Sequence, residues 1–224
     1  MKIHAGNNRR FFATRGTPFS GLENMGRRSE HSMDQIREMA LDAAEKIVDE
    51  EGIDTLSTRR IAAKMGYTSG TLYMVFRNLD DLVLKLNQRT FLRMYEALSA
   101  AAAIPAEPRE SVRHISRAYI DFGQKHFRRW ELIFQRHWPA SFVYPSWYQA
   151  EIGRCFHVVE EALGRLLKGK VPDASIPLAT RSLWCSMHGI HALHGSGRLA
   201  RLGISGLNEL VDYQVDVFLK GVAP

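Results

Sequence analysis

Residues 56–76 read LSTRRIAAKMGYTSGTLYMVF. Ser57 has the side chain of a helix N-cap and Gly66 can end a helix in the left-handed conformation, so a short helix is predicted between them. Thr68 follows as the cap of another short helix over 69–76. Two short helices joined through a glycine are typical of a helix-turn-helix, whose second helix stays exposed and enters the major groove of DNA.

Five apolar positions are expected to pack the two helices together. They are Leu56, Ile61, Ala62, Met65 and Leu72. The helix over 69–76 is otherwise short and polar, and its exposed face suits DNA recognition, because N-terminal side chains can reach base edges while the first amides favour a phosphate.

The same stretch resembles the DNA-binding domain of the TetR family of repressors, and the resemblance extends over about residues 35–86. Gly-Thr-Leu-Tyr at 70–73, then Phe76, then Asp-Asp-Leu at 80–82 occur in the order that the family shows. The resemblance implies base contacts by Ser69, Gly70, Thr71 and Met74. It implies phosphate contacts by Thr58, Arg59, Tyr73, Arg77 and Asn78.

Several of these residues also have a purely structural interpretation. Thr68 belongs to the DNA-binding set either as a contact or as a helix cap, and Met74 either faces bases or packs sideways onto the next helix. Tyr73 fits a phosphate clamp, with its ring on the core and its hydroxyl outward. Leu72 and Phe76 are interpreted as core residues.

Leu79 departs from the family pattern, which usually has a lysine just before the acidic opening of the fourth helix. The leucine removes one expected phosphate contact, and Arg77 is a candidate to replace it. The alternative is that Leu79 is buried between two domains, where it would act in packing.

The rest of the chain predicts helices and no strand, so the fold class is all-α. An amphipathic helix runs from Asp34 to a stop at Gly52, and a long fourth helix opens at Asp80 and Asp81 and ends near Ala103. Further helices are expected at about 109–126, 127–137, 146–168, 177–194 and 205–220. We therefore expect a three-helix DNA-binding domain at 34–80 and a larger helical effector-binding and dimerisation domain at 81–224.

Residues 1–33 carry six Lys or Arg residues against Glu23 and Glu30, without periodicity. We interpret them as a flexible basic arm, which either enters a DNA groove or has no role. Met25 or Met33 is a candidate for the true start.

Composition narrows the function class. The formal charge of +6 permits a polyanionic partner such as DNA. Cys155 and Cys185 lie in apolar helical patterns, so buried free thiols in a reducing cytoplasm are expected. The sequence shows no apolar run of roughly 18 to 20 residues, no secretory signal, no phosphate loop and no hydrolase or zinc-protease motif, so a membrane protein and an enzyme are not expected, and neither is a cofactor.

Residues 184–189, Trp-Cys-Ser-Met-His-Gly, resemble the signature of the TetR subgroup named for Trp-His-Gly. Trp184 and His188 are one turn apart, and Gly189 is expected to let another helix approach, so packing is favoured over ligand contact. The resemblance also implies an apolar pocket for a small hydrophobic or aromatic effector. Candidate pocket residues are Phe122, Trp130, Phe134, Trp138, Trp147, Trp184 and His188. The spacing of His188, His191 and His194, without a carboxylate or paired cysteines, argues against a metal site.

The last two helices carry more apolar surface than one subunit easily buries, so we expect them to form a homodimer interface. The residues are Leu183, Met187, Ile190, Leu207, Leu210, Val211, Val215 and Phe218. A dimer would place two recognition helices about 34 to 36 Å apart on double-stranded palindromic operator DNA, as a repressor or an activator. The alternatives are a helical enzyme or carrier with a vestigial DNA-binding fold, and a structural adaptor.

Overall fold

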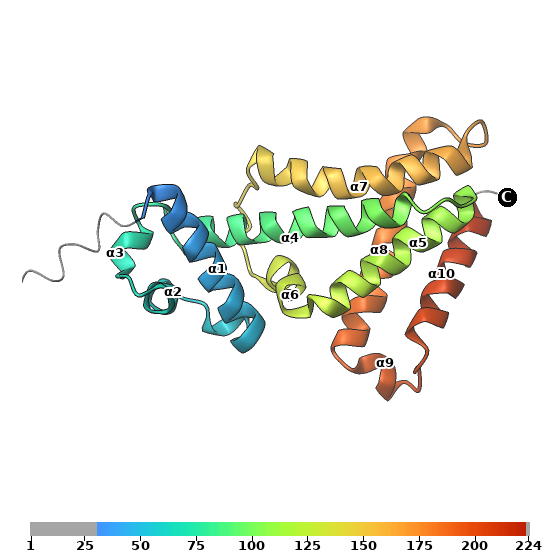
Figure 1. The fold of residues 1–224 in the computed structure, drawn as a ribbon. Coiled ribbons are helices and arrows are strands. Elements are labelled where there is room, and N and C mark those ends of the chain that lie inside the picture. Colours follow the sequence, from blue (N-terminus) through green and yellow to red (C-terminus); the bar gives the residue numbers. More distant parts are fainter. Residues whose placement is uncertain (1–30, 223–224) are drawn as a thin grey trace, which may run out of the picture.

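The computed structural model describes residues 31–222, which form ten α-helices, two turns of 3-10 helix and no strand (Figure 1). This confirms the all-α prediction. The N-terminal helices are α1 Met33–Glu51, α2 Thr58–Met65, α3 Ser69–Leu72 and α4 Leu79–Ala102, with 3-10 turn η2 at Ile53–Thr55. The C-terminal helices are α5 Pro108–Lys125, α6 Phe127–Gln135, α7 Ser146–Leu167, α8 Ile176–Gly195, α9 Arg198–Arg201 and α10 Leu207–Val222, with η3 at Asp173–Ser175. The short α9 was not predicted.

The local signals at 56–76 set the helix boundaries as expected. The Ser57 hydroxyl accepts a hydrogen bond from the backbone N–H of Arg60 at the start of α2. Gly66 ends α2 with φ of 74°, a conformation that a β-carbon would strain. At the start of α1, Ser32 and Gln35 form a reciprocal capping box.

The recognition helix is shorter than predicted. The expected helix over 69–76 ends at Leu72, because the chain then tightens into a turn in which the amides of Val75 and Phe76 bond to the Leu72 carbonyl. This turn places Val75 and Phe76 in the core. Thr68 occupies the N-cap position without a side-chain capping bond.

The structure has two hydrophobic cores, and α4 contributes to both, as its course from the helix-turn-helix into the larger helical body shows (Figure 1). Leu82 and Leu86 pack with α1, α2 and α3, whereas Phe91 and Met94 pack with α5, α7 and α8. Helix α6 bridges the cores as well, since its Leu132 belongs to the N-terminal core. Its neighbouring residues Trp130 and Ile133 lie in the C-terminal core.

Ion pairs reinforce the junction of the two cores. The buried carboxylate of Glu45 on α1 contacts Arg93 on α4 and Arg129 on α6. Asp49, one turn later on α1, also contacts Arg129.

The expected domain boundary at residue 80 stays a proposal. Helices α4 and α6 contribute residues to both hydrophobic cores, so the cores alone do not mark a boundary there. Residues 1–30 of the expected basic arm lie outside the described residues. The last residues of the expected arm, Ser32 and Met33, already form the start of α1.

Candidate nucleic-acid interface and ligand cavity

The end of α3 and the turn after it present large side chains to solvent. Tyr73 is 57% exposed and Met74 is 63% exposed. The exposure of Met74 disfavours the alternative in which it packs onto α4. Leu72 and Phe76 are buried, as expected for core residues.

The N-terminal end of α3 carries the smaller candidates for base contact. Gly70 is exposed, whereas Ser69 and Thr71 are half-buried. The hydroxyls of Thr68 and Thr71 lie 3.3 Å apart, so they can share a hydrogen bond and act as one polar group. A small hydroxyl pair beside a glycine leaves room for a base edge to approach the helix.

Two predicted phosphate ligands are unpaired cations. Arg59 and Arg77 are exposed, and neither forms an ion pair within residues 31–222. By contrast, Arg60 of α2 pairs with Glu51, and Lys64 pairs with Glu50 at 2.6 Å. The half-buried Thr58 begins α2 beside Arg59. The helix-turn-helix thus keeps some basic side chains available for an external anion.

Asn78 and Leu79 have structural roles at the start of α4. The Asn78 side-chain oxygen accepts a hydrogen bond from the backbone N–H of Asp81 at 2.8 Å, which makes Asn78 a helix cap and leaves its amide nitrogen for a phosphate. Leu79 is half-buried and packs against the N-terminal core. Of the two interpretations given for Leu79, the structure supports packing.

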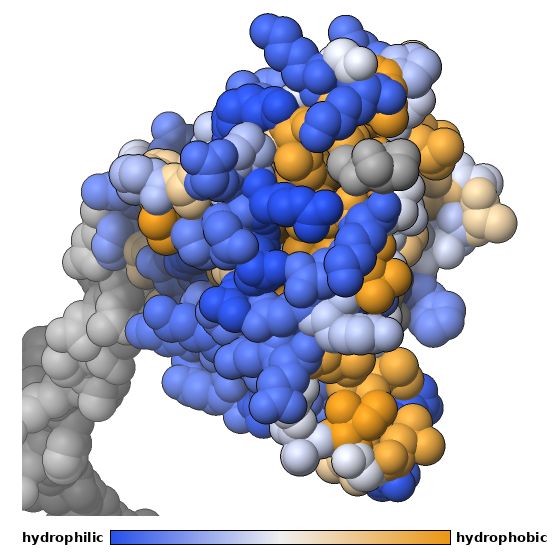
Figure 2. Space-filling model, turned by 90° about the vertical axis from the view of Figure 1, so that its right-hand side faces the viewer, coloured by the Kyte–Doolittle hydropathy of each residue, from blue (hydrophilic) through white to orange (hydrophobic). Residues whose placement is uncertain are grey.

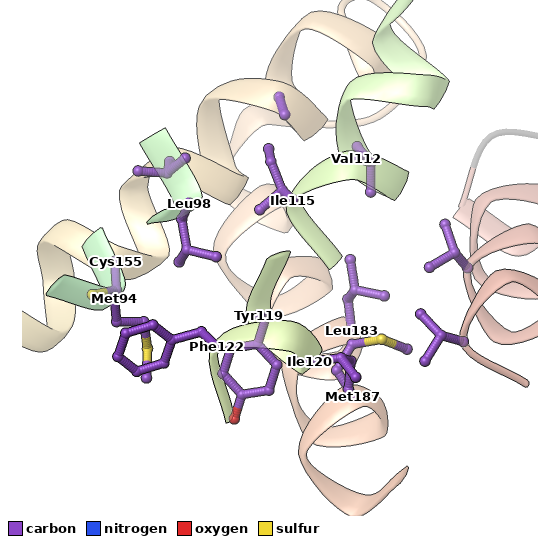
Figure 3. Close-up of a cluster of buried hydrophobic side chains, with 14 of the residues drawn as sticks. Met94, Leu98, Val112, Ile115, Tyr119, Ile120, Phe122, Cys155, Leu183 and Met187 are labelled. Carbon is purple, nitrogen blue, oxygen red and sulfur yellow. The ribbon is translucent and has the colours of Figure 1, made fainter. Parts of the chain in front are cut away.

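A cavity of about 430 Å³ lies within the C-terminal core. Figure 3 shows side chains of this core converging from α4, α5, α7 and α8, among them Met94, Tyr119, Cys155 and Met187. The lining residues come from α4 (Phe91, Met94, Leu98), α5 (Ile115, Ser116, Tyr119), α6 (Ile133, Phe134), Tyr144 before α7, α7 (Tyr148, Ile152, Cys155, Phe156, Val159) and α8 (Thr180, Arg181, Leu183, Trp184, Met187). Most of these side chains are apolar or aromatic, as in sites for hydrophobic ligands.

Two of the seven predicted pocket residues, Phe134 and Trp184, line this cavity. The other five do not. Phe122 and Trp130 are buried core residues. Trp138 stacks on Phe142, and the ring of Trp147 lies beneath the ammonium of Lys85. Nδ1 of His188 lies 3.1 Å from the Tyr119 hydroxyl, and the two groups share a hydrogen bond. The spacing of three and four residues between Phe91, Met94 and Leu98 indicates that they share one face of a helix. The spacing does not indicate that this face lines a cavity.

Burial favours the neutral form of the tyrosines, the thiol and the histidines in and beside the cavity wall. Desolvation raises the pKa of Tyr119, Tyr148 and the Cys155 thiol to about 12. Next to this core, desolvation lowers the pKa of His188, and that of His191 to about 4. These buried groups are therefore uncharged at neutral pH, and Arg181 is the charged residue among those that line the cavity.

One sequence-based expectation about α8 is corrected, and a second is not met within the subunit. Cys155 is buried as expected, but Cys185 is exposed, because it lies on the outer face of α8. A β-carbon at Gly189 would meet no atom within 4 Å, so no helix of the subunit approaches there. The close approach is instead at Gly123 of α5, where a β-carbon would lie 2.6 Å from Cε1 of His191.

Within residues 31–222, no group of three or more His, Cys, Asp or Glu side chains is arranged to hold a metal ion. His188 and His191 instead pack on the Trp130 ring, with centroid distances of 4.7 and 4.2 Å. No helix in this part of the chain is long and apolar enough to cross a membrane.

An exposed helix-turn-helix joined to a larger helical body with its own cavity defines a DNA-binding regulator of the two-domain type. Residues 40–86 match the family described as bacterial regulatory proteins, tetR family. Residues 112–218 match the family described as the tetracyclin repressor-like C-terminal domain. The chain belongs to the TetR family of transcriptional regulators, which are not enzymes. The Trp-His-Gly subgroup is not confirmed.

Individual proteins resemble this chain in part of its sequence or in its fold. A helix-turn-helix-type transcriptional regulator of Staphylococcus aureus is 35% identical over 65 residues, which cover 28% of this chain and 35% of that protein. A Rhodococcus sp. RHA1 protein of unknown function has the same fold, with a TM-score of 0.72 and 22% identity over 88% of this chain and 98% of that one. A TetR-like regulator from the same organism gives a TM-score of 0.59 and 22% identity over 87% and 99% of the two chains. The fatty acid degradation regulator FadR of Bacillus halodurans gives a TM-score of 0.58 and 17% identity, over 83% of this chain and 95% of that one.

Proposed function

We propose that this protein is a homodimeric repressor that binds palindromic operator DNA through α2 and α3 and releases it when a small apolar effector enters the cavity. The exposed Tyr73 and Met74 at the end of α3 carry the proposal. These two side chains stand where the second helix of a helix-turn-helix meets DNA, and Arg59 and Arg77, which form no ion pair within residues 31–222, suit a polyanion.

The release mechanism rests on linkage. If the effector favours a domain geometry unsuited to the operator, operator affinity falls by the same factor by which effector affinity falls on DNA. The cavity and the DNA-binding core share α4 and α6: Phe91 and Ile133 line the cavity, while Leu86 and Leu132 on the same helices pack in the N-terminal core. A ligand that displaces the cavity walls therefore acts on the support of the helix-turn-helix.

The proposed dimer uses the outer faces of α8 and α10. Most residues first expected at this interface, including Met187 and Val215, are buried within the subunit. Other apolar residues on these helices are exposed: Leu178 (74%) and Leu193 (38%) on α8, and Tyr213 (69%) and Val217 (47%) on α10. Figure 2 shows hydrophobic residues along the right-hand edge of one face of the molecule, and again at its lower end. Exposed apolar surface of this kind favours association.

A mobility-shift experiment tests DNA binding. The protein is expected to bind the DNA upstream of its own gene more tightly than a shuffled sequence of the same composition. Equal affinity for both would overturn the operator proposal and favour a helical carrier or enzyme with a vestigial DNA-binding fold. An absence of binding to either would favour an adaptor.

A light-scattering experiment tests the dimer. Val217→Glu places a charge on the exposed face of α10 and is expected to yield monomers, because an unpaired charge is costly to bury in an interface. Val143→Glu is the matched control, since Val143 is 79% exposed in the segment before α7. A Val217→Glu protein that stays dimeric would contradict this interface.

A further inference from the structure

The cavity walls leave few polar atoms for a ligand. The Ser116 hydroxyl donates to the Val112 carbonyl at 2.9 Å. The Cys155 thiol donates to the Phe91 carbonyl at 3.6 Å. These two lining groups are engaged within their own walls, so a ligand gains little by facing them.

The two buried tyrosine hydroxyls of the wall are engaged as well. The hydroxyl of Tyr119 lies 3.1 Å from Nδ1 of His188 and accepts a hydrogen bond from the Trp130 indole at 3.4 Å. The hydroxyl of Tyr148 accepts from the side-chain amide of Asn87 at 3.1 Å. Both rings therefore present mainly their apolar faces to the cavity.

Arg181 is the charged residue of the lining, and its charge is already matched. Its guanidinium donates to Glu160 at 2.6 Å and to the Pro177 carbonyl at 2.9 Å, and it lies 4.7 Å from the centre of the Phe156 ring. The side chain is 46% exposed, so it marks the rim rather than the interior. A ligand carboxylate would have to compete with Glu160 for it, or enter an apolar space unpaired.

Thr180 differs from every group above. It lies on α8, it lines the cavity, and it is fully buried. Within residues 31–222 its hydroxyl has no hydrogen-bond partner, although a helical threonine can usually bond to the carbonyl four residues earlier. A buried hydroxyl is both a donor and an acceptor, and leaving it unpaired is unfavourable.

From these observations we propose that the cavity selects an uncharged, mainly apolar ligand carrying one hydrogen-bonding group, and that the Thr180 hydroxyl pairs with that group and determines specificity. The aromatic walls, such as Phe134, Tyr144 and Trp184, contact the apolar body of the ligand. This inference rests on the proposed effector-binding function, but it concerns ligand chemistry and not DNA.

Two pairs of probes test the charge preference by calorimetric titration of the full-length protein at pH 7.5 without DNA. The pairs are 1-decanol with decanoate, and 2-naphthol with 2-naphthoate. At least one neutral probe is expected to bind, about tenfold or more tightly than its carboxylate. Equal or tighter binding of the carboxylates, or binding of none of the four, would overturn the proposal.

Three variants test the role of Thr180. Thr180→Val keeps the shape and removes the hydroxyl, so affinity for the neutral probe is expected to fall about five- to tenfold, whereas Thr180→Ser should stay within about twofold. Ser111→Ala is the matched control, because Ser111 on α5 carries another buried hydroxyl without a partner among the described residues and does not line the cavity. Unchanged affinity in Thr180→Val, or an equal loss in Ser111→Ala, would overturn the assignment.

Melting curves keep this test interpretable. Thr180→Val removes an unpaired buried hydroxyl and is expected to melt at the wild-type temperature or above it, so a loss of affinity cannot come from unfolding. Operator binding is measured separately. Neutral-probe binding without any effect on the operator would contradict the repressor mechanism and leave the ligand chemistry supported.

Discussion

Arg129 of α6 holds Asp49 of α1 through two parallel hydrogen bonds, one of them from Nε to Oδ1 at 2.7 Å. The same guanidinium reaches Glu45, a buried carboxylate that also contacts Arg93 of α4. One side chain thus ties the first helix of the DNA-binding core to a helix that carries cavity residues. Bidentate pairing of this kind fixes orientation as well as position.

Arg129→Met is expected to lower the free energy of unfolding by about 2 to 3 kcal/mol, because it removes a partner from a buried carboxylate. Chemical denaturation measures the change. Arg128→Met is the control: its exposed guanidinium donates to the Asp49 carbonyl at 2.9 Å, and the loss should stay below about 1 kcal/mol. If the two variants lost similar amounts of unfolding free energy, the ion pairs of Arg129 would contribute no more to stability than the single exposed hydrogen bond of Arg128.

Thr71 and Tyr73 are expected to affect DNA binding in different ways. Thr71 stands near the start of α3 with its hydroxyl beside that of Thr68, whereas Tyr73 follows the helix and is exposed. Thr71→Ala should narrow the ratio of operator to random-DNA affinity, and Tyr73→Phe should weaken both affinities alike. Binding titrations on the two DNAs decide the matter, and equal, sequence-selective losses would refute the assignment.

The unpaired cations Arg59 and Arg77 are expected to neutralise phosphates. Replacing both with alanine should weaken binding to all DNA sequences and reduce the slope of log affinity against log salt by about two per subunit. Replacing Arg60 and Lys64 is the matched control, because these cations are already paired with glutamates. A larger change of slope in the control would reverse the roles of the two sets.

Leu79→Lys tests the position at which the chain leaves the family pattern. Since Leu79 packs against the N-terminal core, the lysine is expected to lower the melting temperature and to leave the salt dependence of DNA binding unchanged. A slope that steepens by about one unit per subunit, with an unchanged melting temperature, would mean that the side chain reaches a phosphate.

The sequence predicted the first helix of the helix-turn-helix well because its signals are local, whereas it extended the second helix beyond its end at Leu72. Ser57 and Gly66 act on backbone groups within one turn of themselves, so their spacing alone fixes α2. The cavity could not be predicted in this way, since Met94, Cys155 and Met187 meet only when three helices cross. Aromatic density was a poor guide for the same reason, and it selected Trp130, which fills the core instead of lining the cavity.

The proposed dimer face illustrates a second limit of sequence patterns. Helix α10 has apolar residues on two sides, and periodicity groups those that share a side without saying which side is turned inward. Val211 and Val215 pack inside the subunit, whereas Tyr213 and Val217 stay outside. Only the position of α10 against α5 and α8 decides between the two faces.

His191 gives a prediction about acid stability. The residue is fully buried, and its ring packs edge-on against Trp130. Neither ring nitrogen has a hydrogen-bond partner in the described part of the chain. Desolvation, and then the neighbouring His188 and His194, lower its pKa from 6.5 to about 4. In this pH range His191 is therefore protonated more readily in the unfolded chain than in the folded protein.

The direction of the effect follows from proton linkage. Between pH 4 and 6.5 the unfolded state binds more protons at His191, so its contribution to stability is complete above about pH 6.5 and is lost as the pH falls towards 4. The pKa values of His126 and His188 are also lowered by desolvation, and they act in the same direction. The melting temperature is therefore expected to fall steadily between pH 7 and pH 4.5.

His191→Leu separates this contribution from the general effect of acid. Leucine takes no proton, so the fall of melting temperature with decreasing pH should be shallower than in the wild type, whatever the variant's stability at pH 7. His157→Leu is the control for the loss of a histidine as such, because the imidazole of His157 on α7 is 68% exposed. A slope in His191→Leu as steep as that of the wild type would mean that the acid sensitivity arises elsewhere in the protein.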